Sequence, residues 1–388
     1  MKIAAIRNFI NTKRGAQQAF IDMMLALKKR GHDIDIYVLN ISDELREELK
    51  DDFSIECLNF REWRLHSLNI LHPINELRVL YRHLRLAKKI SNKGYDLAFI
   101  DHYDYSPLIL HFLQIPKVYY CYEPPRQYYE PTPFQPGIYK VYKFITQASK
   151  YLDKYCVKRA DLILCNSDYI REYIYKVYGI FAITNYLGID LEKFKKLNLE
   201  KEELVVSVGV IYAHKAHDFV VRSVGLIPQN KRPKLMIIAA AEWGGYRGKG
   251  KEGLYSLASQ EEVDLEIKSY VTDEEFVEWH NKARVVAIAY VMEPSIEPVA
   301  LGCETPIVAV REGGARETII HNETGILTNR DEKEFAQAIE YLLDNPDVAA
   351  KMGKKGREWI ERNFTWEKCA QNLERNFERL LERCGKSR

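Results

Sequence analysis

The chain has 388 residues, of which 46% are hydrophobic and 29% are charged. This length and balance predict a globular protein with two cores, and they exclude a largely disordered chain. The 57 Lys and Arg residues nearly cancel the 55 Asp and Glu residues, which argues against a dedicated nucleic-acid-binding protein.

The seven cysteines are widely spread, and none belongs to a Cys-x-x-Cys pair. We therefore expect neither a disulfide framework nor a zinc site, and a reducing, cytoplasmic environment fits this pattern best. The sequence holds no run of 18 apolar residues, and its N-terminus lacks the charged start and apolar core of a secretion signal. We therefore expect no membrane-spanning segment.

The first half of the chain predicts an α/β fold. A β-α-β unit is expected from a strand at 1–7, a helix at 16–30 and a strand at 34–39. Further buried strands are expected at 95–100, 117–121 and 161–166. Continuous apolar strands separated by helices are typical of a parallel sheet that helices cover on both faces.

The same pattern starts again near residue 202. We expect strands at 203–209, 234–240, 264–268, 284–290 and 306–310, with helices at 217–226, 273–282 and 298–303. Strand character lapses between 186 and 202, so a boundary is placed there. The sequence thus predicts two doubly wound domains, at 1–188 and 202–365, in which ligands bind beyond the carboxyl ends of the strands.

Three loops that follow predicted strands contain residues suited to an anionic group. Gly15 precedes a helix, whose first unpaired amides favour negative charge, although a plain turn would look the same. Lys215 also precedes a helix, where it would neutralise a diphosphate or simply be solvated. The amides of Gly313 and Gly314 suit either phosphate oxygens or a tight turn.

A fourth such loop is Glu293-Pro-Ser-Ile-Glu297, which leads into a helix with a proline at its first position. Its two carboxylates suit the hydroxyl groups of a sugar or a ribose, or they are ordinary acids at a helix start. Four loops of this type predict a split diphosphate site, because such a site needs donors from several strand ends.

Several motifs resemble those of the retaining glycosyltransferases of family 4, which have the GT-B fold of two facing Rossmann-like domains. The similarity is strongest over 284–366, in EPSIEPVALGCETPIVAVREGGARETIIHNETGILTNRD and the later MGKKGREWIERNFTWEK. Weaker matches are RGAQQAFIDMMLALKKRGHDIDIYVL, IPKVYYCYEPPRQYYE, ADLILCNSDYIREYIYKVYG and VSVGVIYAHKAHD. The resemblance thus extends over almost the whole chain.

This resemblance implies transfer of a sugar from a nucleoside-diphosphate sugar to a hydroxyl acceptor, with retention of configuration. Glu293 matches the first acid of the family's E-x7-E motif, and His102 lies where the family often places a group that faces the acceptor. With Lys215, which would contact the diphosphate, these are the expected catalytic residues. The expected donor-binding residues are Gly15, Gly209, Lys215, Glu293, Pro294, Ser295, Ile296, Glu297, Gly313 and Gly314.

The resemblance also implies a role for each part of the chain. The first domain would bind the acceptor, the second would bind the nucleotide sugar, and residues 366–388 would form a helix that returns to the N-terminal domain. No metal or other cofactor is implied. Asp33 and Asp35 have the spacing of a metal-binding D-x-D motif, but they begin a predicted strand, so a solvated strand start is the better interpretation.

The sequence departs from the family pattern at three positions. Val210 stands where the family has an arginine, Val299 where the second acid of E-x7-E is expected, and Tyr122 where a histidine is common. A catalytically silent GT-B scaffold or partner subunit is therefore an alternative, and a sugar-nucleotide epimerase of the same architecture is another. An NAD-dependent enzyme is disfavoured, because no G-x-G-x-x-G follows the first strand of either domain.

Aromatic and basic segments of the first domain bear on the acceptor. Residues 119–136 are rich in Tyr and Pro, which suits a glycan or lipid-linked acceptor or a structured lid. Residues 78–89 combine helical spacing with several cations. They indicate either a solvated helix or contact of a cytoplasmic enzyme with the inner face of a membrane.

Overall fold

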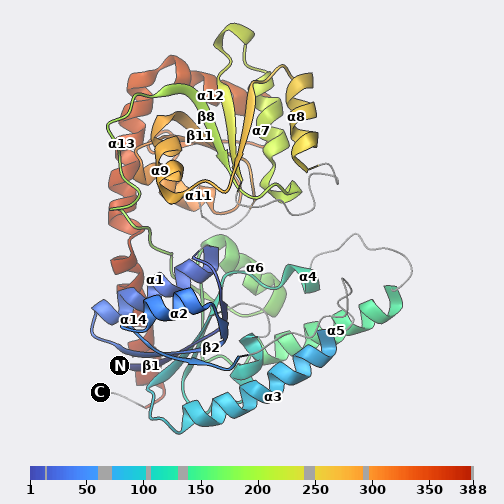
Figure 1. Cartoon of the computed structure of the whole chain (residues 1–388), viewed down its shortest axis with the longest axis vertical. Helices are drawn as coiled ribbons and strands as arrows, with labels where there is room; N and C mark the ends of the chain where they lie inside the picture. The colour runs from blue at the N-terminus through green and yellow to red at the C-terminus, as the bar shows by residue number, and fades with distance from the viewer. Residues whose placement is uncertain are drawn as a thin grey trace. The chain divides into compact units, whose positions relative to one another are not determined.

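The computed structural model describes residues 1–13, 15–59, 72–101, 106–129, 139–239, 250–291 and 297–385. The chain forms two compact units, one of Met1–Gly188 with Trp366–Arg388 and one of Ile189–Thr365. Each unit has its own parallel sheet with helices packed against it (Figure 1). The prediction of two doubly wound α/β domains is confirmed.

The sheet of the first unit has the strand order β3-β2-β1-β4-β5-β6-β7. Its strands are β1 (Lys2–Ile10), β2 (Asp33–Ile41), β3 (Ser54–Cys57), β4 (Leu97–Asp101), β5 (Lys117–Cys121), β6 (Leu162–Cys165) and β7 (Ile183–Thr184). Every pairing is parallel. The order reverses between β1 and β4, which is where a doubly wound sheet places its ligand crevice.

Helices cover both faces of this sheet. They are α1 (Gly15–Lys29), α2 (Asp43–Leu49), α3 (His72–Ser91), η2 (Ser106–His111), α4 (Arg126–Tyr129), α5 (Tyr139–Val157), α6 (Asp168–Tyr178) and α14 (Trp366–Arg383). One buried cluster joins α1 and α14 to the sheet, and another joins α3, η2 and α6 to the opposite face. The apolar strands therefore have both of their faces buried, as their composition predicts.

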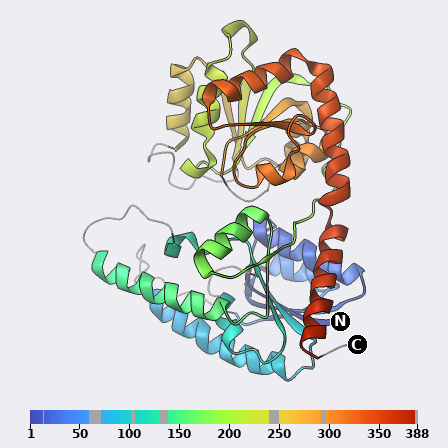
Figure 2. The ribbon, with the colours of Figure 1, turned by 180° about the vertical axis from the view of Figure 1, so that it is seen from behind.

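The C-terminal helix α14 packs within the first unit. It lies along α1, as Figures 1 and 2 both show. Arg30, just beyond α1, donates from Nε to Glu374 at 3.0 Å and from Nη1 to Glu367 at 2.6 Å. Phe377 packs against Phe99 of β4, with ring centroids 6.0 Å apart. These contacts attach the end of the chain to the core of the first sheet.

The second unit has the strand order β10-β9-β8-β11-β12-β13, again all parallel. Its strands are β8 (Glu202–Val208), β9 (Lys234–Ala239), β10 (Leu265–Ser269), β11 (Ala283–Ile288), β12 (Ile307–Val310) and β13 (Gly325–Thr328). Its helices are η3 (Ala213–Lys215), α7 (His217–Gly225), η4 (Gln229–Lys231), α8 (Gly250–Gln260), α9 (Asp273–Lys282), α10 (Glu297–Gly302), α11 (Ala315–Thr318), α12 (Glu332–Asp344) and α13 (Pro346–Asn363). The order reverses between β8 and β11.

The two aspartates of the D-x-D sequence lie at the start of β2. Asp33 is exposed, whereas Asp35 is half-buried and accepts a hydrogen bond from the Tyr95 hydroxyl. Across the residues that the structure describes, no group of three His, Cys, Asp or Glu side chains is arranged to hold a metal ion. Within those same ranges, no helix combines the length and apolar character needed to cross a membrane.

Buried neutral histidines should make the fold sensitive to acid. Burial lowers the pKa of His83 to about 3 and the pKa values of His217 and His280 to about 4. In the unfolded chain these groups titrate near pH 6.5, so below that pH the unfolded state binds more protons than the folded state. Stability is therefore retained above pH 6.5 and is lost as the pH falls towards 4, by about 1.4 kcal/mol per pH unit for each titrating histidine.

The measurement is the unfolding temperature between pH 7.5 and pH 5. His280→Gln removes one titrating group, so its unfolding temperature should fall less steeply with acid than that of the unmodified protein. Equal slopes for the two proteins would show that His280 is not held neutral in the fold.

Candidate functional site

The carboxyl ends of β8, β11 and β12 form one edge of the second sheet, because these strands are parallel neighbours. The loops that leave this edge carry a set of residues predicted from the sequence to bind the donor: Gly209, Lys215, Glu297, Gly313 and Gly314. The edge includes the reversal of strand order between β8 and β11. It is thus the position at which doubly wound sheets bind ligands.

Lys215 is held over Gly209. Gly209 follows β8 with φ +151°, and a Cβ atom at this position would lie only 3.0 Å from Cδ of Lys215. The aliphatic part of the lysine therefore occupies the space that a side chain at Gly209 would need. The Lys215 Nζ atom lies 4.2 Å from the centroid of the Tyr290 ring, which follows β11. The lysine thus extends from the end of β8 towards the end of β11.

We expect Gly209→Ala to displace the Lys215 side chain. The new methyl group would meet the lysine stem, and the positive φ is a conformation that residues other than glycine rarely adopt. Nucleoside-diphosphate affinity, measured by calorimetric titration, should fall on the order of tenfold, since about 1–3 kcal/mol of strain is introduced. Gly94→Ala, a change at another positive φ with open space around it, is the control. Unchanged affinity of Gly209→Ala would contradict the packing argument.

Tyr290 connects two of the predicted residues. Tyr290 is buried, with only 3% of its surface exposed to solvent. Its hydroxyl donates a hydrogen bond of 3.0 Å to Oε2 of Glu297, which is fully buried and begins α10. Lys215 therefore contacts the ring of Tyr290, and Glu297 contacts its hydroxyl group. Tyr290 is not among the residues predicted from the sequence, because an aromatic residue near a strand end ordinarily belongs to the core.

His217 packs next to Lys215 at the start of α7. Its Nδ1 atom lies 3.0 Å from the Ser207 hydroxyl, and burial is the main reason that its pKa falls to about 4. At neutral pH the ring is therefore uncharged. It supports the end of β8 without adding a charge that would repel the lysine.

The glycine pair follows β12. Gly313 has φ +56°, and Gly314 is the cap of the short helix α11. The preceding residue, Glu312, forms an ion pair with Arg330, at 2.9 Å from Nε and 2.7 Å from Nη2. The Arg330 Nη2 atom also donates to the carbonyl of Ala289 at 2.9 Å. This arginine follows β13, and it was not predicted from the sequence because no strand was expected there.

The remaining predicted residues are placed differently. Gly15 belongs to the first unit, where it begins α1 with φ +54°. Glu293, Pro294, Ser295, Ile296 and His102 lie outside the described residues. Their roles stay predictions.

A second polar group lies inside the first unit, near the carboxyl ends of β1 and β4. Arg7 and Asp101 form an ion pair in which both side chains are fully buried. His83 of α3 is also buried, and its Nε2 atom lies 3.3 Å from Oδ1 of Asn8. An arginine within the apolar run KIAAIRNFI is the signal that could have revealed this group in the sequence.

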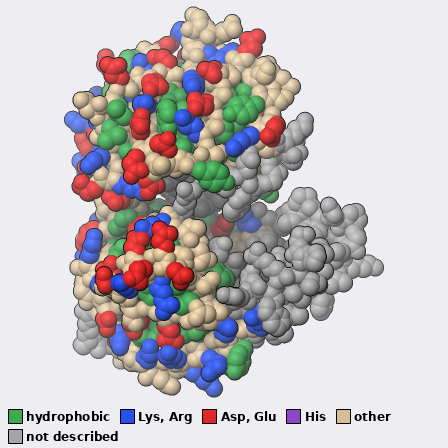
Figure 3. Space-filling view, in the orientation of Figure 1, with side chains coloured by type: hydrophobic (Ala, Val, Ile, Leu, Met, Phe, Trp, Pro, Cys, Tyr) green, Lys and Arg blue, Asp and Glu red, His purple; other side chains and the backbone are tan. Residues whose placement is uncertain are grey.

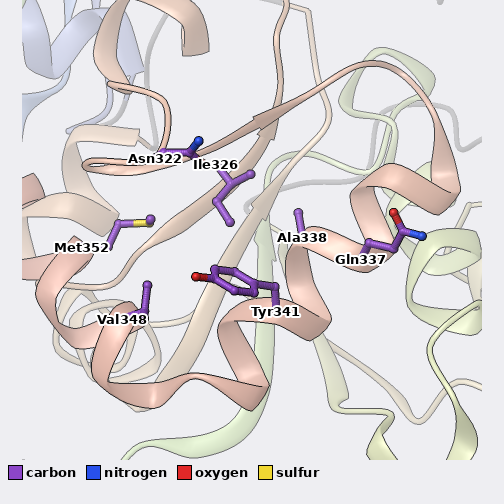
Figure 4. Close-up of a pocket in the computed structure, with 7 residues that line it drawn as sticks. All are labelled: Asn322, Ile326, Gln337, Ala338, Tyr341, Val348 and Met352. Carbon is purple, nitrogen blue, oxygen red and sulfur yellow. The ribbon is translucent and has the colours of Figure 1, made fainter.

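A pocket of about 430 Å³ lies elsewhere in the second unit, between β13, α12 and α13. Figure 4 shows Tyr341, Val348 and Met352 with Ile326 around an apolar interior, with Asn322, Gln337 and Ala338 completing the lining. None of the residues predicted to bind the donor lines it.

The fold resembles solved glycosyltransferase structures over nearly its full length. Sucrose-phosphate synthase from Thermosynechococcus elongatus covers 98% of this chain, and the chain covers 99% of it, with a TM-score of 0.75 and 18% identity. Anabaena Alr3699/HepE, solved in complex with UDP, has a TM-score of 0.73 and 16% identity, with coverages of 97% and 99%. Two parallel-sheet units with a C-terminal helix in the first define the GT-B class of proteins.

Family comparisons agree with this class. Residues 189–359 match the model of glycosyl transferases group 1, and residues 13–193 match that of glycosyltransferase family 4. The chain belongs to glycosyltransferase family 4, as its motifs predicted.

Among curated relatives, the chain is similar to the GDP-mannose-dependent alpha-(1-6)-phosphatidylinositol monomannoside mannosyltransferase of Mycolicibacterium smegmatis. The two are 28% identical over 236 residues, which cover 53% of this chain and 59% of the relative. Human alpha-1,3/1,6-mannosyltransferase ALG2 is 35% identical over 82 residues, or 21% of this chain and 20% of the relative. The chain thus spans about three fifths or less of the length of these relatives.

Proposed function

We propose that this protein transfers a sugar from a nucleoside-diphosphate sugar to a hydroxyl acceptor, with retention of anomeric configuration. The second predicted domain, 202–365, binds the donor, and the first predicted domain, 1–188, binds a glycan or lipid-linked acceptor. The observation that carries this proposal is the placement of Lys215, which extends over Gly209 towards Tyr290 at the strand-order reversal of the second sheet. Membership of glycosyltransferase family 4 supports it.

The main chemical task is to stabilise the diphosphate as it leaves. The bond from the anomeric carbon to the diphosphate breaks, a bond to the acceptor oxygen forms on the same face, and the acceptor hydroxyl gives its proton to an oxygen of the departing diphosphate. A fixed ammonium group and backbone amides favour the charge that develops on the diphosphate. We assign this role to Lys215, the amides of 294–296 and the Gly313–Gly314 turn. Glu293 is assigned to the donor sugar and His102 to the acceptor side.

The test is a panel of nucleoside-diphosphate sugars offered with and without glycan and lipid-linked acceptors. We expect acceptor-dependent release of a nucleoside diphosphate, and NMR of the product should show the anomeric configuration of the donor. Binding without turnover on every acceptor would favour the silent scaffold. An isomerised sugar formed without an acceptor would favour the epimerase.

We also infer that the first unit contacts an anionic membrane surface through α3 and α5. These helices lie side by side in Figures 1 and 2, and both pack against η2. Tyr151 and Tyr155 of α5 are exposed, and their rings are stacked with centroids 6.4 Å apart. Tyr81 of α3 is 60% exposed. Aromatic rings beside cations are typical of a surface that lies at a lipid interface.

The charges on these helices fit that partner. Exposed cations include Arg85, Lys88 and Lys89 on α3 and Lys154 on α5. Figure 3 shows Lys and Arg side chains gathered over the C-terminal part of α3. The one acidic residue in the sequence of α5 is Asp153, which is buried and accepts hydrogen bonds from Tyr129 and Tyr178 at 2.7 and 2.8 Å. Anionic lipids would therefore meet little opposing charge on α5.

Reversing two of these charges should weaken membrane binding. Each cation near an anionic surface contributes about 1 kcal/mol, so Lys88→Glu with Lys154→Glu should reduce binding at least on the order of tenfold. The measurement is sedimentation with phosphatidylcholine vesicles that contain phosphatidylglycerol, with pure phosphatidylcholine vesicles for comparison. Lys231→Glu, an exposed change in the second unit, is the control. Equal binding of all three proteins would refute the assignment of this surface.

A further inference from the structure

Tyr290 contacts two residues of the proposed donor site through two different parts of its side chain. The face of its ring lies 4.2 Å from Nζ of Lys215, and its hydroxyl lies 3.0 Å from Oε2 of Glu297. We propose that Tyr290 is a positioning residue, which fixes the Lys215 ammonium group where the donor diphosphate binds. This inference rests on the proposed function, since it concerns the same site.

The contact with the ring restricts the lysine. An ammonium group within about 6 Å of an aromatic centroid is attracted by the negative face of the ring, and the attraction grows as water is excluded. Tyr290 is only 3% exposed, so the ring itself is well shielded. Free lysine side chains occupy many rotamers. Here the stem is confined by Gly209 and the ammonium group by Tyr290, so the charge is held in place before a ligand arrives.

The contact with the carboxylate restricts the ring. A buried carboxyl group requires hydrogen-bond partners, and the Tyr290 hydroxyl supplies one of them. Glu297 is fully buried and begins α10, so its position is set by the helix. Its burial favours a supporting role through Tyr290 over direct contact with a ribose hydroxyl. The helix α10 thus positions Glu297, Glu297 positions Tyr290, and Tyr290 positions Lys215.

The topology explains why this support is available. Lys215 comes from the loop after β8, and Tyr290 comes from the loop after β11, which is the neighbouring strand. The two loops are far apart in the sequence but leave the same edge of the sheet. A tyrosine near the end of β11 can therefore hold a cation that the loop after β8 supplies.

A double-mutant cycle tests the proposal in the full chain. Calorimetric titration with UDP, GDP and ADP gives the affinity of the unmodified protein, of Lys215→Ala, of Tyr290→Leu and of the double variant. We expect each single change to weaken binding of the preferred nucleotide on the order of tenfold. The double variant should bind about as weakly as Lys215→Ala alone, because residues that act as a unit are not additive.

Conservative variants separate the ring from the hydroxyl. Tyr290→Phe keeps the ring under the lysine, so it should bind more tightly than Tyr290→Leu. Glu297→Gln should resemble Tyr290→Phe, and combining the two changes should add little. The control is Trp279→Leu in α9, which removes an aromatic ring whose centroid lies 4.6 Å from Nζ of Lys268 in β10 and 4.9 Å from Nζ of Lys282 in α9. It should leave nucleotide affinity unchanged.

The outcomes distinguish this inference from the proposed function. If the losses for Lys215→Ala and Tyr290→Leu multiply in the double variant, Tyr290 has only a structural role and the inference is overturned, while the donor site stands. If the unmodified protein binds none of the three nucleotides, the proposed function fails and the inference fails with it. Thermal unfolding of each variant shows whether a lost affinity reflects a lost fold.

Discussion

Lys215→Ala should lower the turnover of sugar transfer on the order of a hundredfold. Removing one preorganised donor to a developing negative charge costs about 2.7–4 kcal/mol of transition-state stabilisation, and Lys215 is the side chain that we assign to the leaving diphosphate. Its ammonium group lies 4.2 Å from a buried aromatic ring, so it does not need to be reorganised during the reaction. Because Lys215 is assigned to a charge that develops in the transition state, and because it is already in position, we expect its loss to lower turnover strongly and not only to weaken binding.

The measurement is the steady-state release of nucleoside diphosphate at saturating donor and acceptor. Lys231→Ala is the matched control, since Lys231 is a cation of the same unit whose Nζ lies 2.7 Å from a carboxylate oxygen of Asp344 on α12. It should retain the turnover of the unmodified protein. Normal sugar transfer by Lys215→Ala would show that the assigned role is wrong, even if the family membership stands.

Much of the fold follows from local sequence, because continuous apolar runs and helix caps give strong signals. The strand at 117–121 and the helix at 273–282 occur with the predicted bounds. The helix is fixed by a capping box, in which Thr272 and Glu275 satisfy each other's backbone amides. The strands β3, β7 and β13, each at the edge of its sheet, were not predicted. They have only four, two and four residues, and their sequences SIEC, IT and GILT lack the continuous apolar run that made the four-residue strands β6 and β12 predictable.

The candidate site was predictable to the extent that it depends on strand ends. The positions of Lys215 and Gly313 at one edge follow from the rule that parallel strands end together. The contact of Tyr290 with Glu297 does not, because it depends on where α10 begins relative to the sheet. Arg330 was missed for a related reason, since its position follows from β13. Short elements and side-chain directions are set by tertiary packing, which a local pattern does not encode.

The second large effect is expected from the buried ion pair of the first unit. Arg7→Met should destabilise the protein by about 3–5 kcal/mol, because it leaves the Asp101 carboxylate buried without its cation. Both side chains are fully buried, so water cannot take the place of the missing partner. The pair joins neighbouring strands, since β1 and β4 are in register up to Ile6 and Ile100, one residue before each partner.

Urea unfolding at neutral pH gives the loss, and a second variant shows its origin. Arg7→Met with Asp101→Leu removes both charges, so it should recover much of the stability, as replacing a whole buried pair by apolar groups is often neutral. Asp101 directly precedes His102 in the sequence. If the double variant is stable but transfers sugar slowly, the pair positions the chain that leads to the acceptor side. If Arg7→Met alone unfolds at the same urea concentration as the unmodified protein, the buried charge carries no net cost and the argument from desolvation is wrong.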